Sequence, residues 1–523
     1  MGGIPSMFGG AAVTLSTRPV RKSWHFAPAE AHSLHDLLSS FLDELGNSAL
    51  ILVESGAKAE SPILAVRAER AADLATLPSA AALCQKYVKL RDRDIALLND
   101  PSSGGTTLSE FTLVAGAAFE TAGPEAELLL VKRISLPARI SESGKIDAEG
   151  VRVPPMPIAM AGQINTDILS AMSAHPLAPQ GLSAAIQAGC ADLLTAIKKL
   201  KAAGQDPGSE FRRANFKRYL ADCSRMAQDR LHHLPLGAKT VSQRLPTGEL
   251  LKLQLRIDET RITFDFAGTE SSTRVSLTEM MTFGACMAVT ASLFADGLPM
   301  NAATFSMIQV SAPSRTLLSG QGPVGSLRST RFVLAAVCDL VRAAFAQLNS
   351  SHRGAGGATV SGHYQFEFSD GKFWSGTLEP GSPARADADG LDAYALWEPK
   401  SGQDFSMEQV ERDYPLRVLG CGIRTNSGGR GLRRGGDGAF YSFECLAPVT
   451  ARWALGPSIA KADGIDGGKS GTAAKIEVRR KGSGDLTEIP NADGSIALNA
   501  GDQIHFFGAG GGAFGSPPED DAG

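Results

Sequence analysis

The chain has 523 residues, whereas a single hydrophobic core usually stops growing at about 250–300 residues, so we expect more than one packed domain. Hydrophobic residues make up 43% of the chain and charged residues 20%, which excludes an intrinsically disordered protein. The formal net charge of -4 excludes the globally basic character of many nucleic-acid-binding proteins and gives no overall attraction to anionic membranes.

Residues 1–30 carry only short targeting signals. The start "MGGIPS" fits a loose myristoylation pattern, and the first acidic residue is Glu30, a faint feature of transit peptides. We prefer an untargeted, poorly ordered leader, because both signals are short and unspecific.

No run approaches the ~18–20 apolar residues of a membrane span. The 7 cysteines include no CxxC pair, so we expect a cytoplasmic protein with mostly buried cysteines, and we single out only Cys421, near a glycine-rich loop.

The first part of the chain alternates apolar runs with alanine- and leucine-rich segments. Residues 48–55 and 61–69 have the pattern of strands. Residues 97–119 place a Pro-Ser-Ser-Gly-Gly turn between two apolar runs, and loops on a rigid support often carry functional sites. Residues 141–165 are rich in proline, so we expect an irregular connection there instead of a helix or a central strand.

The middle of the chain predicts helices and one hairpin. Residues 248–270 alternate apolar and polar side chains on both sides of a turn near Asp258, as a β-hairpin does. Apolar residues at helical spacing predict four helices: 182–204, 207–234 (starting at Ser209), 277–295 and 329–348.

Beyond residue 350, short strand-like runs alternate with glycine-rich turns, the pattern of a mostly β region. We therefore predict a multi-domain α+β protein with helical segments in its N-terminal and middle part and a glycine-rich, mostly β C-terminal part. The predicted regions are a leader over 1–30, a main region over 31–350, a β-rich region over 351–517 and a tail over 518–523.

Several familiar catalytic motifs are absent from the sequence. There is no HExxH, no GxSxG elbow and no EF-hand loop, which removes the recognisable zinc protease, α/β-hydrolase and calcium-binding interpretations. The segment "GIDGGKS" (464–470) has the Gly-Lys-Ser end of a phosphate-binding loop, but Asp463 stands where the first glycine is required. We interpret it as a glycine-rich turn. The adjacent His232 and His233 point in different directions on a helix and should not share a metal, and His505 fits a strand.

Two groups of residues are candidates for binding or catalysis. Asp265 follows a predicted strand and precedes a glycine turn, so it is either a site carboxylate or a turn former. The stretch "NSGGRGLRRGG" (426–436) is either an anion site, since guanidinium groups and successive backbone amides suit phosphate or carboxylate, or a solvated charged turn. Its candidate anion-binding residues are Gly428, Gly429, Arg430, Arg433 and Arg434.

The wider segment "YPLRVLGCGIRTNSGGRGLRRGGDG" (414–438) resembles the hydantoinase B/oxoprolinase family, whose members carry a "YPLRV…LR.dSGG.G..RGG.G" pattern here. Other segments are similar to family motifs in the same order, so the resemblance runs from about residue 40 to 517. These segments are "LLNDPSSGGTTLSEFTLV" (97–114), "EGVRVPPMPI" (149–158), "FDFAGTE" (264–270), "GLPMNAATFSMIQVSAP" (297–313) and "AGDQIHFFGAGGGAFGSP" (500–517).

The resemblance implies a subunit of an ATP-dependent enzyme. Members of the family include 5-oxoprolinases, N-methylhydantoinases, caprolactam-opening enzymes and acetone or acetophenone carboxylases. It implies a hydantoinase A-type partner that binds ATP and phosphorylates a lactam or carbonyl oxygen, and so a hetero-oligomer that needs neither nucleic acid nor a membrane. It also implies a divalent metal, Zn or Mn, near the family's "GGTH..D" loop.

The sequence departs from the family at the expected metal ligands. In "GGTTLSE" (104–110), Thr107 stands at the histidine position and Glu110 at the aspartate position. The family's "HHAD" region corresponds to "RISLPAR" (133–139), which has no histidine or carboxylate. Glu110 is thus the remaining candidate metal ligand, with Asp100 near it, and so small a ligand set would bind a divalent cation weakly.

An upstream aspartate is also usual in the family, but here only Glu54 and Glu60 are available.

Three functions stay open. The first is a B-type subunit with a reduced or lost metal site and a structural role. The second is an active subunit whose rebuilt site hydrolyses or carboxylates a phosphorylated substrate, with Asp100, Glu110 and Asp265 as its catalytic residues. The third is a non-enzymatic scaffold on the same fold.

Overall fold

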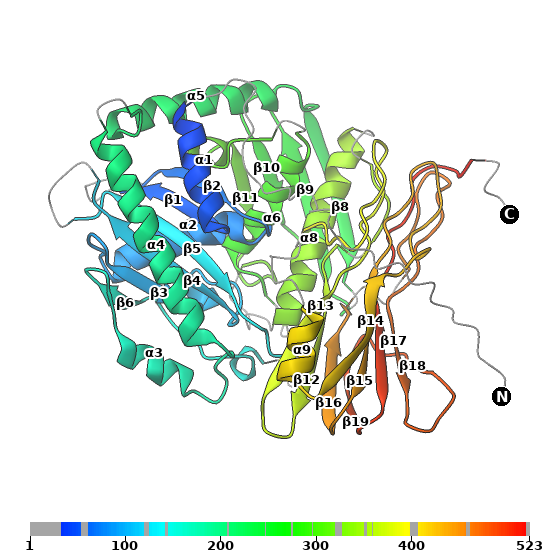
Figure 1. The fold of residues 1–523 in the computed structure, drawn as a ribbon. Helices are drawn as coiled ribbons and strands as arrows, with labels where there is room; N and C mark the ends of the chain where they lie inside the picture. Colours follow the sequence, from blue (N-terminus) through cyan, green and yellow to red (C-terminus); the bar gives the residue numbers. More distant parts are fainter. Residues whose placement is uncertain are drawn as a thin grey trace.

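The computed structural model describes residues 33–518 except 54–60, 120–124, 142–144, 207–208, 246, 273–275, 295–296, 320–326, 350–352, 358, 398–405 and 457–460. The predicted leader, Glu54 and Glu60 lie outside the described residues. Figure 1 shows helices and sheets in the first part of the chain (blue to green) beside a mostly β part (yellow to red). The predicted α+β class, with its mostly β C-terminal part, is confirmed.

The first sheet has seven strands in the order β2-β1-β5-β4-β3-β6-β7, and all neighbouring strands are antiparallel. Its strands are β1 (Ser48–Leu52), β2 (Ile63–Arg67), β3 (Ile95–Leu98), β4 (Glu110–Ala117), β5 (Leu128–Ser135), β6 (Met156–Met160) and β7 (Gln163–Ile164). The predicted turn between β3 and β4 is present and contains a short 3-10 helix, Pro101–Ser103.

Helices cover both faces of the first sheet. α1 (Ser33–Leu45) and α4 (Leu182–Gln205) pack on one face, and α2 (Asp73–Tyr87) packs on the other. α4 confirms the helix predicted over 182–204. It approaches the sheet closely at Gly189, where an added Cβ would lie only 2.5 Å from the Ile134 side chain. A larger residue there would push the helix or the strand aside.

A second, four-stranded sheet has the order β11-β10-β9-β8, and one core joins its apolar face to α2, α6 and α8. The predicted hairpin is confirmed as β9 and β10, and Asp258 holds its turn by accepting a hydrogen bond from Thr260 N at 2.9 Å. The strands are β8 (Gly237–Arg244), β9 (Leu250–Ile257), β10 (Ile262–Asp265) and β11 (Ile308–Ser311). The other helices of this part are α3 (Thr166–Ser173), α5 (Arg213–Leu231), α6 (Glu279–Ser292), α7 (Ala302–Phe305) and α8 (Leu327–Leu348).

Two predictions about this part need correction. The helix predicted from Ser209 begins instead at Arg213, because Ser209 accepts a hydrogen bond from Phe211 N in a turn that precedes the helix. The connection predicted over 141–165 contains β6 and β7. The pairing between β6 and β3 shifts register at Pro157. The ladder is irregular at this point and does not require the backbone N–H that proline lacks, so β6 tolerates this residue.

Two more sheets form the C-terminal part, with the orders β13-β12-β16-β19 and β14-β15-β20-β17-β18, and their apolar faces share one aromatic-rich core. The first contains β12 (Gly362–Phe368), β13 (Phe373–Leu378), β16 (Val449–Ala454) and β19 (Asp493–Leu498). The second contains β14 (Leu416–Ile423), β15 (Ala439–Cys445), β17 (Lys475–Arg479), β18 (Thr487–Ile489) and β20 (Gln503–Phe507).

β12 has two different faces. Tyr364 and Phe366 point into the aromatic core, whereas the alternate residues His363, Gln365 and Glu367 are polar and contact the first part of the chain. Gln365 Oε1 accepts a hydrogen bond from the backbone at Ile140, and Glu367 pairs with Arg139. The strand period of two residues therefore separates a sandwich core from a polar seam.

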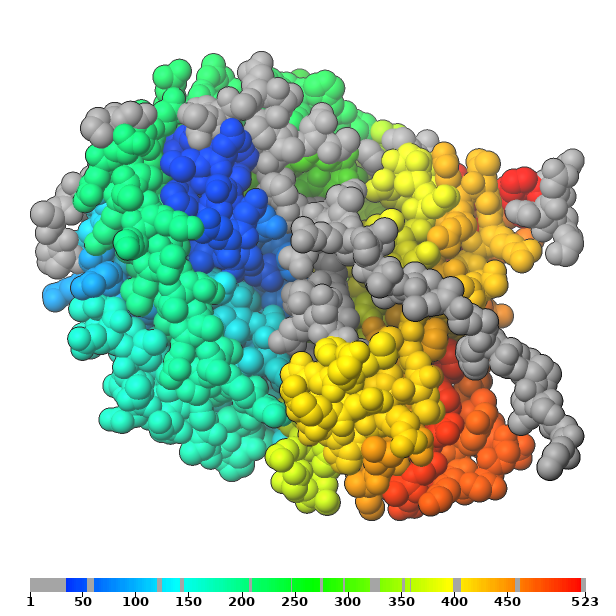
Figure 2. Space-filling view, viewed as in Figure 1, coloured from blue at the N-terminus to red at the C-terminus, as the bar shows by residue number. Residues whose placement is uncertain are grey.

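A further contact between the two parts lies beside α9 (Met407–Asp413). Tyr414, which follows α9, donates its hydroxyl to Gln180 Oε1 at 2.9 Å, just before α4. Figure 2 shows the region around α9 (yellow) lying against the teal surface of the helices.

Among the described residues, no helix is both long and apolar enough to cross a membrane.

The glycine-rich stretch forms what we call the glycine array, in which segments 427–438, 462–471 and 508–515 run side by side with almost no side chains between them. Gly429 N donates to Gly511 O at 2.9 Å, and Gly511 N donates in turn to Gly436 O at 2.9 Å. A Cβ added at Gly429 would lie 2.1 Å from a backbone oxygen of Lys469. The backbones pack at a distance that excludes any side chain.

Candidate functional site

The loop from Asn99 to Ser109 positions Glu110 at the start of β4. The buried side chain of Asn99 donates to the backbone oxygens of Leu108 and Val151, each at 2.8 Å, and so fixes the loop against its neighbour. Asp100 Oδ1 accepts a hydrogen bond from Ser102 N at 3.0 Å and lies 3.7 Å from Arg152 Nη1. Asp100 therefore caps its own loop.

Glu110 is surrounded by arginines. Its side chain is 5% exposed, and Oε1 pairs with Arg70 Nη1 and lies 3.6 Å from Arg331 Nη2. Oε2 accepts a hydrogen bond from Thr106 and lies 4.0 Å from Arg133 Nη1. Both carboxylate oxygens are thus engaged by the chain itself.

Asp73 completes this buried network from the first residue of α2. It accepts a hydrogen bond from Arg70 Nε at 2.9 Å, and its second oxygen lies 3.2 Å from Arg133 Nη1. Arg133, on β5, also donates to Thr76 at 3.2 Å. Burial lowers the pKa of Arg133 to about 10, although the nearby Asp73 raises it. The guanidinium remains charged at neutral pH.

Arg331 links the network to the C-terminal part, since its Nη1 contacts Nε2 of His363 on β12. Burial and the charge of Arg331 hold the pKa of His363 well below its ordinary value, so the imidazole is neutral at pH 7. We call this set the arginine cluster: Arg70, Asp73, Glu110, Arg133, Arg331 and His363.

A divalent metal does not fit the arginine cluster. Thr107 stands at the family's histidine position, and its hydroxyl lies 3.2 Å from Ser109 Oγ. A cation bound by Glu110 would lie among the guanidinium groups that now hold this carboxylate, and like charges at such distances repel. In the part of the chain that the structure describes, no three His, Cys, Asp or Glu side chains gather to hold a metal ion.

Asp265 lies elsewhere, at the end of β10 in the second sheet. Its Oδ1 accepts a hydrogen bond from Ala267 N at 3.0 Å, so Asp265 shapes the glycine turn that follows it. Asp100 and Glu110 lie between β3 and β4 and at the start of β4 in the first sheet, whereas Asp265 ends β10 of the second sheet. The structure does not bring these three carboxylates into one group.

The candidate anion-binding residues lie in the glycine array. Gly428 N donates to Asp437 Oδ1 at 2.7 Å, and Gly429 N donates to the backbone, so the chain itself occupies both amides. Arg434 binds both oxygens of Asp392 at 3.0 Å, which raises the arginine pKa. Arg430 and Arg433 are exposed, and in the described region neither forms an ion pair.

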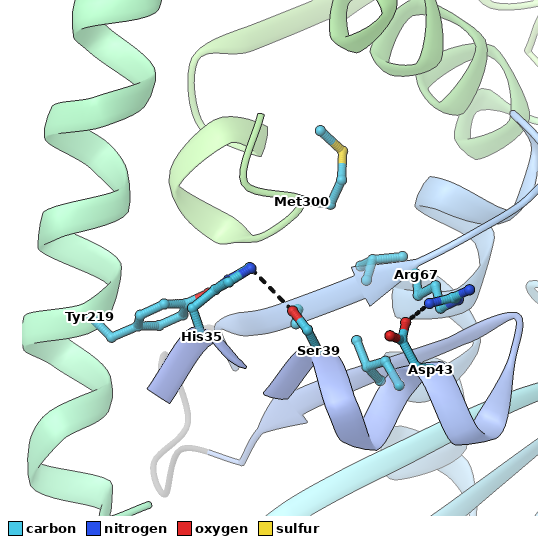
Figure 3. Close-up of a pocket in the computed structure, with 9 residues that line it drawn as sticks. His35, Ser39, Asp43, Arg67, Tyr219 and Met300 are labelled. Carbon is cyan, nitrogen blue, oxygen red and sulfur yellow. Dashed lines mark hydrogen bonds and ion pairs between the residues drawn. The ribbon is translucent and has the colours of Figure 1, made fainter. Parts of the chain in front are cut away.

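A second polar group lies in a small cavity under α1 (Figure 3). His35 Nε2 lies 3.1 Å from Ser39 Oγ, and His35 Nδ1 lies 3.2 Å from the hydroxyl of Tyr219 on α5. Arg67 pairs with Asp43 beside it. The cavity measures about 20 Å³, room for one water molecule, so it does not hold a substrate.

Sequence reasoning identified Glu110 but missed most of its partners. Arg70 and Asp73 form an Arg-x-x-Asp pair at the start of α2, and that spacing is the only local signal. In the sequence, Arg133 is only the first residue of "RISLPAR" (133–139), the segment at the position of the family's "HHAD" region. Arg331 and His363 come from far along the chain, and only the fold brings them to Glu110.

Comparison with known proteins places the chain among distant relatives. An uncharacterised protein of Methanocaldococcus jannaschii is 22% identical over 461 residues, which cover 84% of this chain and 79% of the relative. The 5-oxoprolinase of Saccharomyces cerevisiae is 23% identical over 467 residues, which cover 82% of this chain but only 36% of that protein. This chain therefore spans about a third of the 5-oxoprolinase.

Two solved structures have the same fold. The ATP-dependent caprolactamase of Pseudomonas jessenii superposes with a TM-score of 0.78 at 17% identity, covering 93% of this chain and 90% of the caprolactamase chain. A nucleotide-free acetone carboxylase superposes with a TM-score of 0.71 at 14% identity, covering 92% of this chain and 72% of that one. The family model described as hydantoinase B/oxoprolinase matches residues 59–517. The chain therefore belongs to the hydantoinase B/oxoprolinase family.

Proposed function

We propose that the chain is a B-type subunit of an ATP-dependent complex related to the hydantoinases, oxoprolinases and ketone carboxylases, and that its role there is structural. In this proposal the position of the family's metal site is occupied by the arginine cluster. The cluster stabilises the subunit, and the chain itself performs no metal chemistry.

The observation that carries this proposal is the environment of Glu110. A buried carboxylate that already pairs with Arg70 and Arg331 is not free to bind a cation without leaving those arginines uncompensated. The other carboxylates suggested by the sequence, Asp100 and Asp265, hold loops. The closely packed glycine array supports a structural role for the C-terminal part.

A hydantoinase A-type partner that binds ATP is part of the proposal. The segment 464–470 is not available as a phosphate-binding loop, because it packs against another segment of the glycine array: a Cβ at Gly468 would lie 2.2 Å from Ala513 O. The similar caprolactamase is described as ATP-dependent. If this chain takes part in comparable chemistry, a second chain must supply the nucleotide site.

Native mass spectrometry with metal analysis, on protein purified from its own source, tests the proposal. We expect a co-purifying ATP-binding subunit and no metal retained on this chain. A stoichiometric metal on this chain would contradict the structural role and favour an active subunit with a rebuilt site. Substrate-dependent ATP hydrolysis by the purified chain alone would contradict the need for a partner.

A further inference from the structure

β8 is the outermost strand of the second sheet, and its free edge is uncovered (Figure 1). It has 8 residues, all exposed except Val241, and it pairs with β9 without a register shift. Natural proteins usually protect a sheet edge by a short strand, a proline, a bulge or a covering segment. The strand contains no proline, so in the described part of the chain β8 has none of these protections.

The other edge strands of the described sheets are protected. β14 is interrupted by a register shift, and its Val418 N donates to Glu411 Oε1 of α9 at 2.8 Å. The remaining edge strands have only two to six residues: β2, β7, β11, β13, β18 and β19. β8 is therefore the exception among the described edges.

The backbone groups on the free edge of β8 can be identified from the hydrogen bonds beside the strand. Leu245 N donates to Glu249 O at 2.9 Å, which continues the β8–β9 ladder by one bonded pair. Bonded and unbonded pairs alternate in an antiparallel ladder, so alternate residues of β8 direct their N–H and C=O away from β9. These outward residues are Ala238, Thr240, Ser242 and Arg244, and no described residue forms a hydrogen bond with their backbone on this edge.

Two copies of β8 can pair with each other in antiparallel orientation. A two-fold axis in such a pair passes between two directly opposed residues, because bonded and unbonded pairs alternate along the strands. With the axis at Val241, Thr240 lies opposite Ser242 of the second copy, and Ala238 lies opposite Arg244 of the second copy. Each of these pairs exchanges two hydrogen bonds, so every outward residue of β8 is used.

The charges of β8 are compatible with this pairing. Lys239 and Arg244 are the only charged residues of the strand. With the axis at Val241, Lys239 lies opposite Gln243 and Arg244 lies opposite Ala238, so no like charges face each other across the pair. An axis at Lys239 would instead bring two lysines together. The strand is therefore complementary to a second copy of itself.

We propose that two copies of this chain associate through β8, in antiparallel orientation about a two-fold axis at Val241. Their two four-stranded sheets then form one continuous sheet across the dimer. The pairing needs neither a nucleotide nor the proposed ATP-binding partner, so it is independent of the proposed function.

Sedimentation velocity of the purified full-length chain over a series of concentrations tests this proposal. We expect a reversible, concentration-dependent change from monomer to dimer. A monomer at every concentration would overturn the proposal, whether or not a strand of another protein covers the edge. Because no partner or ATP is present, that result would leave the proposed function untouched.

Thr240→Pro removes an outward N–H close to the centre of the pairing. Because that N–H takes no part in the β8–β9 ladder, the variant should keep its fold, as thermal unfolding verifies. We expect the dimer Kd to rise by at least about tenfold, since each copy loses a hydrogen bond.

Thr240→Val is the matched control for this variant. It changes the same side chain but keeps the N–H, so its Kd should equal that of the unaltered protein. Equal Kd values for Thr240→Pro and Thr240→Val would mean that another surface forms the dimer, which overturns the proposal.

Val241→Cys tests the position of the axis, and it decides the outcome if Thr240→Pro does not fold. Directly opposed residues in an unbonded pair lie about 4.5 Å apart at Cα, within the range that a disulfide spans. We expect mild oxidation to give a covalent dimer of Val241→Cys but not of the unaltered protein. Failure of the variant to cross-link would contradict the axis at Val241 and so overturn the pairing.

Discussion

Arg331 Nη2 lies 3.6 Å from Glu110 Oε1, an ion pair that joins α8 to β4 in the interior. We expect Glu110→Gln to lower the free energy of unfolding by about 3–5 kcal/mol, because it leaves buried arginines without their counter-charge. Chemical denaturation measures the change. The matched control is Glu44→Gln, which breaks a surface pair with Lys199 in which both side chains are about half exposed, and such pairs contribute at most about 1 kcal/mol.

An equal effect of Glu110→Gln and Glu44→Gln would contradict the importance of the arginine cluster for stability. Metal analysis of Glu110→Gln gives a second reading. We expect its metal content to equal that of the unaltered protein, since Glu110 holds arginines rather than a cation.

Gly429→Ala tests the packing of the glycine array. The added Cβ would lie 2.1 Å from Lys469 O, and a backbone atom cannot move aside without disturbing its own hydrogen bonds. We expect a loss of more than about 2 kcal/mol in the free energy of unfolding, visible as a large fall in Tm. Gly484→Ala is the control, since nothing lies within 4 Å of its added Cβ. Similar Tm values for the two variants would show that the array tolerates side chains.

His363 predicts a pH dependence of stability. Burial and Arg331 lower its pKa in the folded state, so the unfolded chain takes up the proton first as the pH falls. The stability that neutral His363 contributes is complete above pH about 6.5 and is lost below that pH. The free energy of unfolding then falls by at most about 1.4 kcal/mol per pH unit. We expect His363→Gln to reduce this slope between pH 7.5 and 5.5, as measured by denaturation at each pH.

His232→Gln, which replaces an exposed histidine, is the variant with which the slope of His363→Gln is compared. The slope does not vanish in His363→Gln, since burial and Arg479 also lower the pKa of His505. A slope identical to that of the unaltered protein would refute the assignment to His363.

Replacement of Arg434 by alanine should change the stability differently from replacement of Arg433, although the two residues are neighbours in sequence. Arg434 binds Asp392 through two hydrogen bonds, but its side chain is 49% exposed, so solvent screens the pair. A double-mutant cycle of Arg434→Ala and Asp392→Ala should give a coupling of at most about 1 kcal/mol. Arg433→Ala, which removes no described ion pair, should leave the stability almost unchanged. A larger loss for Arg433→Ala would reveal a role that the structure does not contain.

Local patterns were sufficient for much of the fold. Apolar residues at helical spacing predicted α4, and alternating residues around Asp258 predicted the β9–β10 hairpin, because both depend on neighbours in sequence. Pro157 misled the analysis, since a shift in strand register relieves the constraint that the residue normally imposes.

The candidate site was less accessible to sequence reasoning. The order β2-β1-β5-β4 brings Arg133 beside Thr112 and Glu110, and α8 then adds Arg331, so each contact depends on the packing of distant segments. The glycine motif had a strong sequence signal but two physical explanations. Only the distances between backbones favour close packing over an exposed anion loop.

The two-faced strand β12 has a consequence for synthesis of the chain on the ribosome. Arg70, Glu110 and Arg133 emerge early, but His363 and the polar face of β12 emerge only after more than two hundred further residues have been translated. Because β12 contributes Tyr364 and Phe366 to the aromatic core, the strand that completes this core also brings His363 to Arg331. The charged interior of a nascent chain therefore lacks its contact with His363 until β12 has been made, so the aromatic core and the charged interior depend on the same strand.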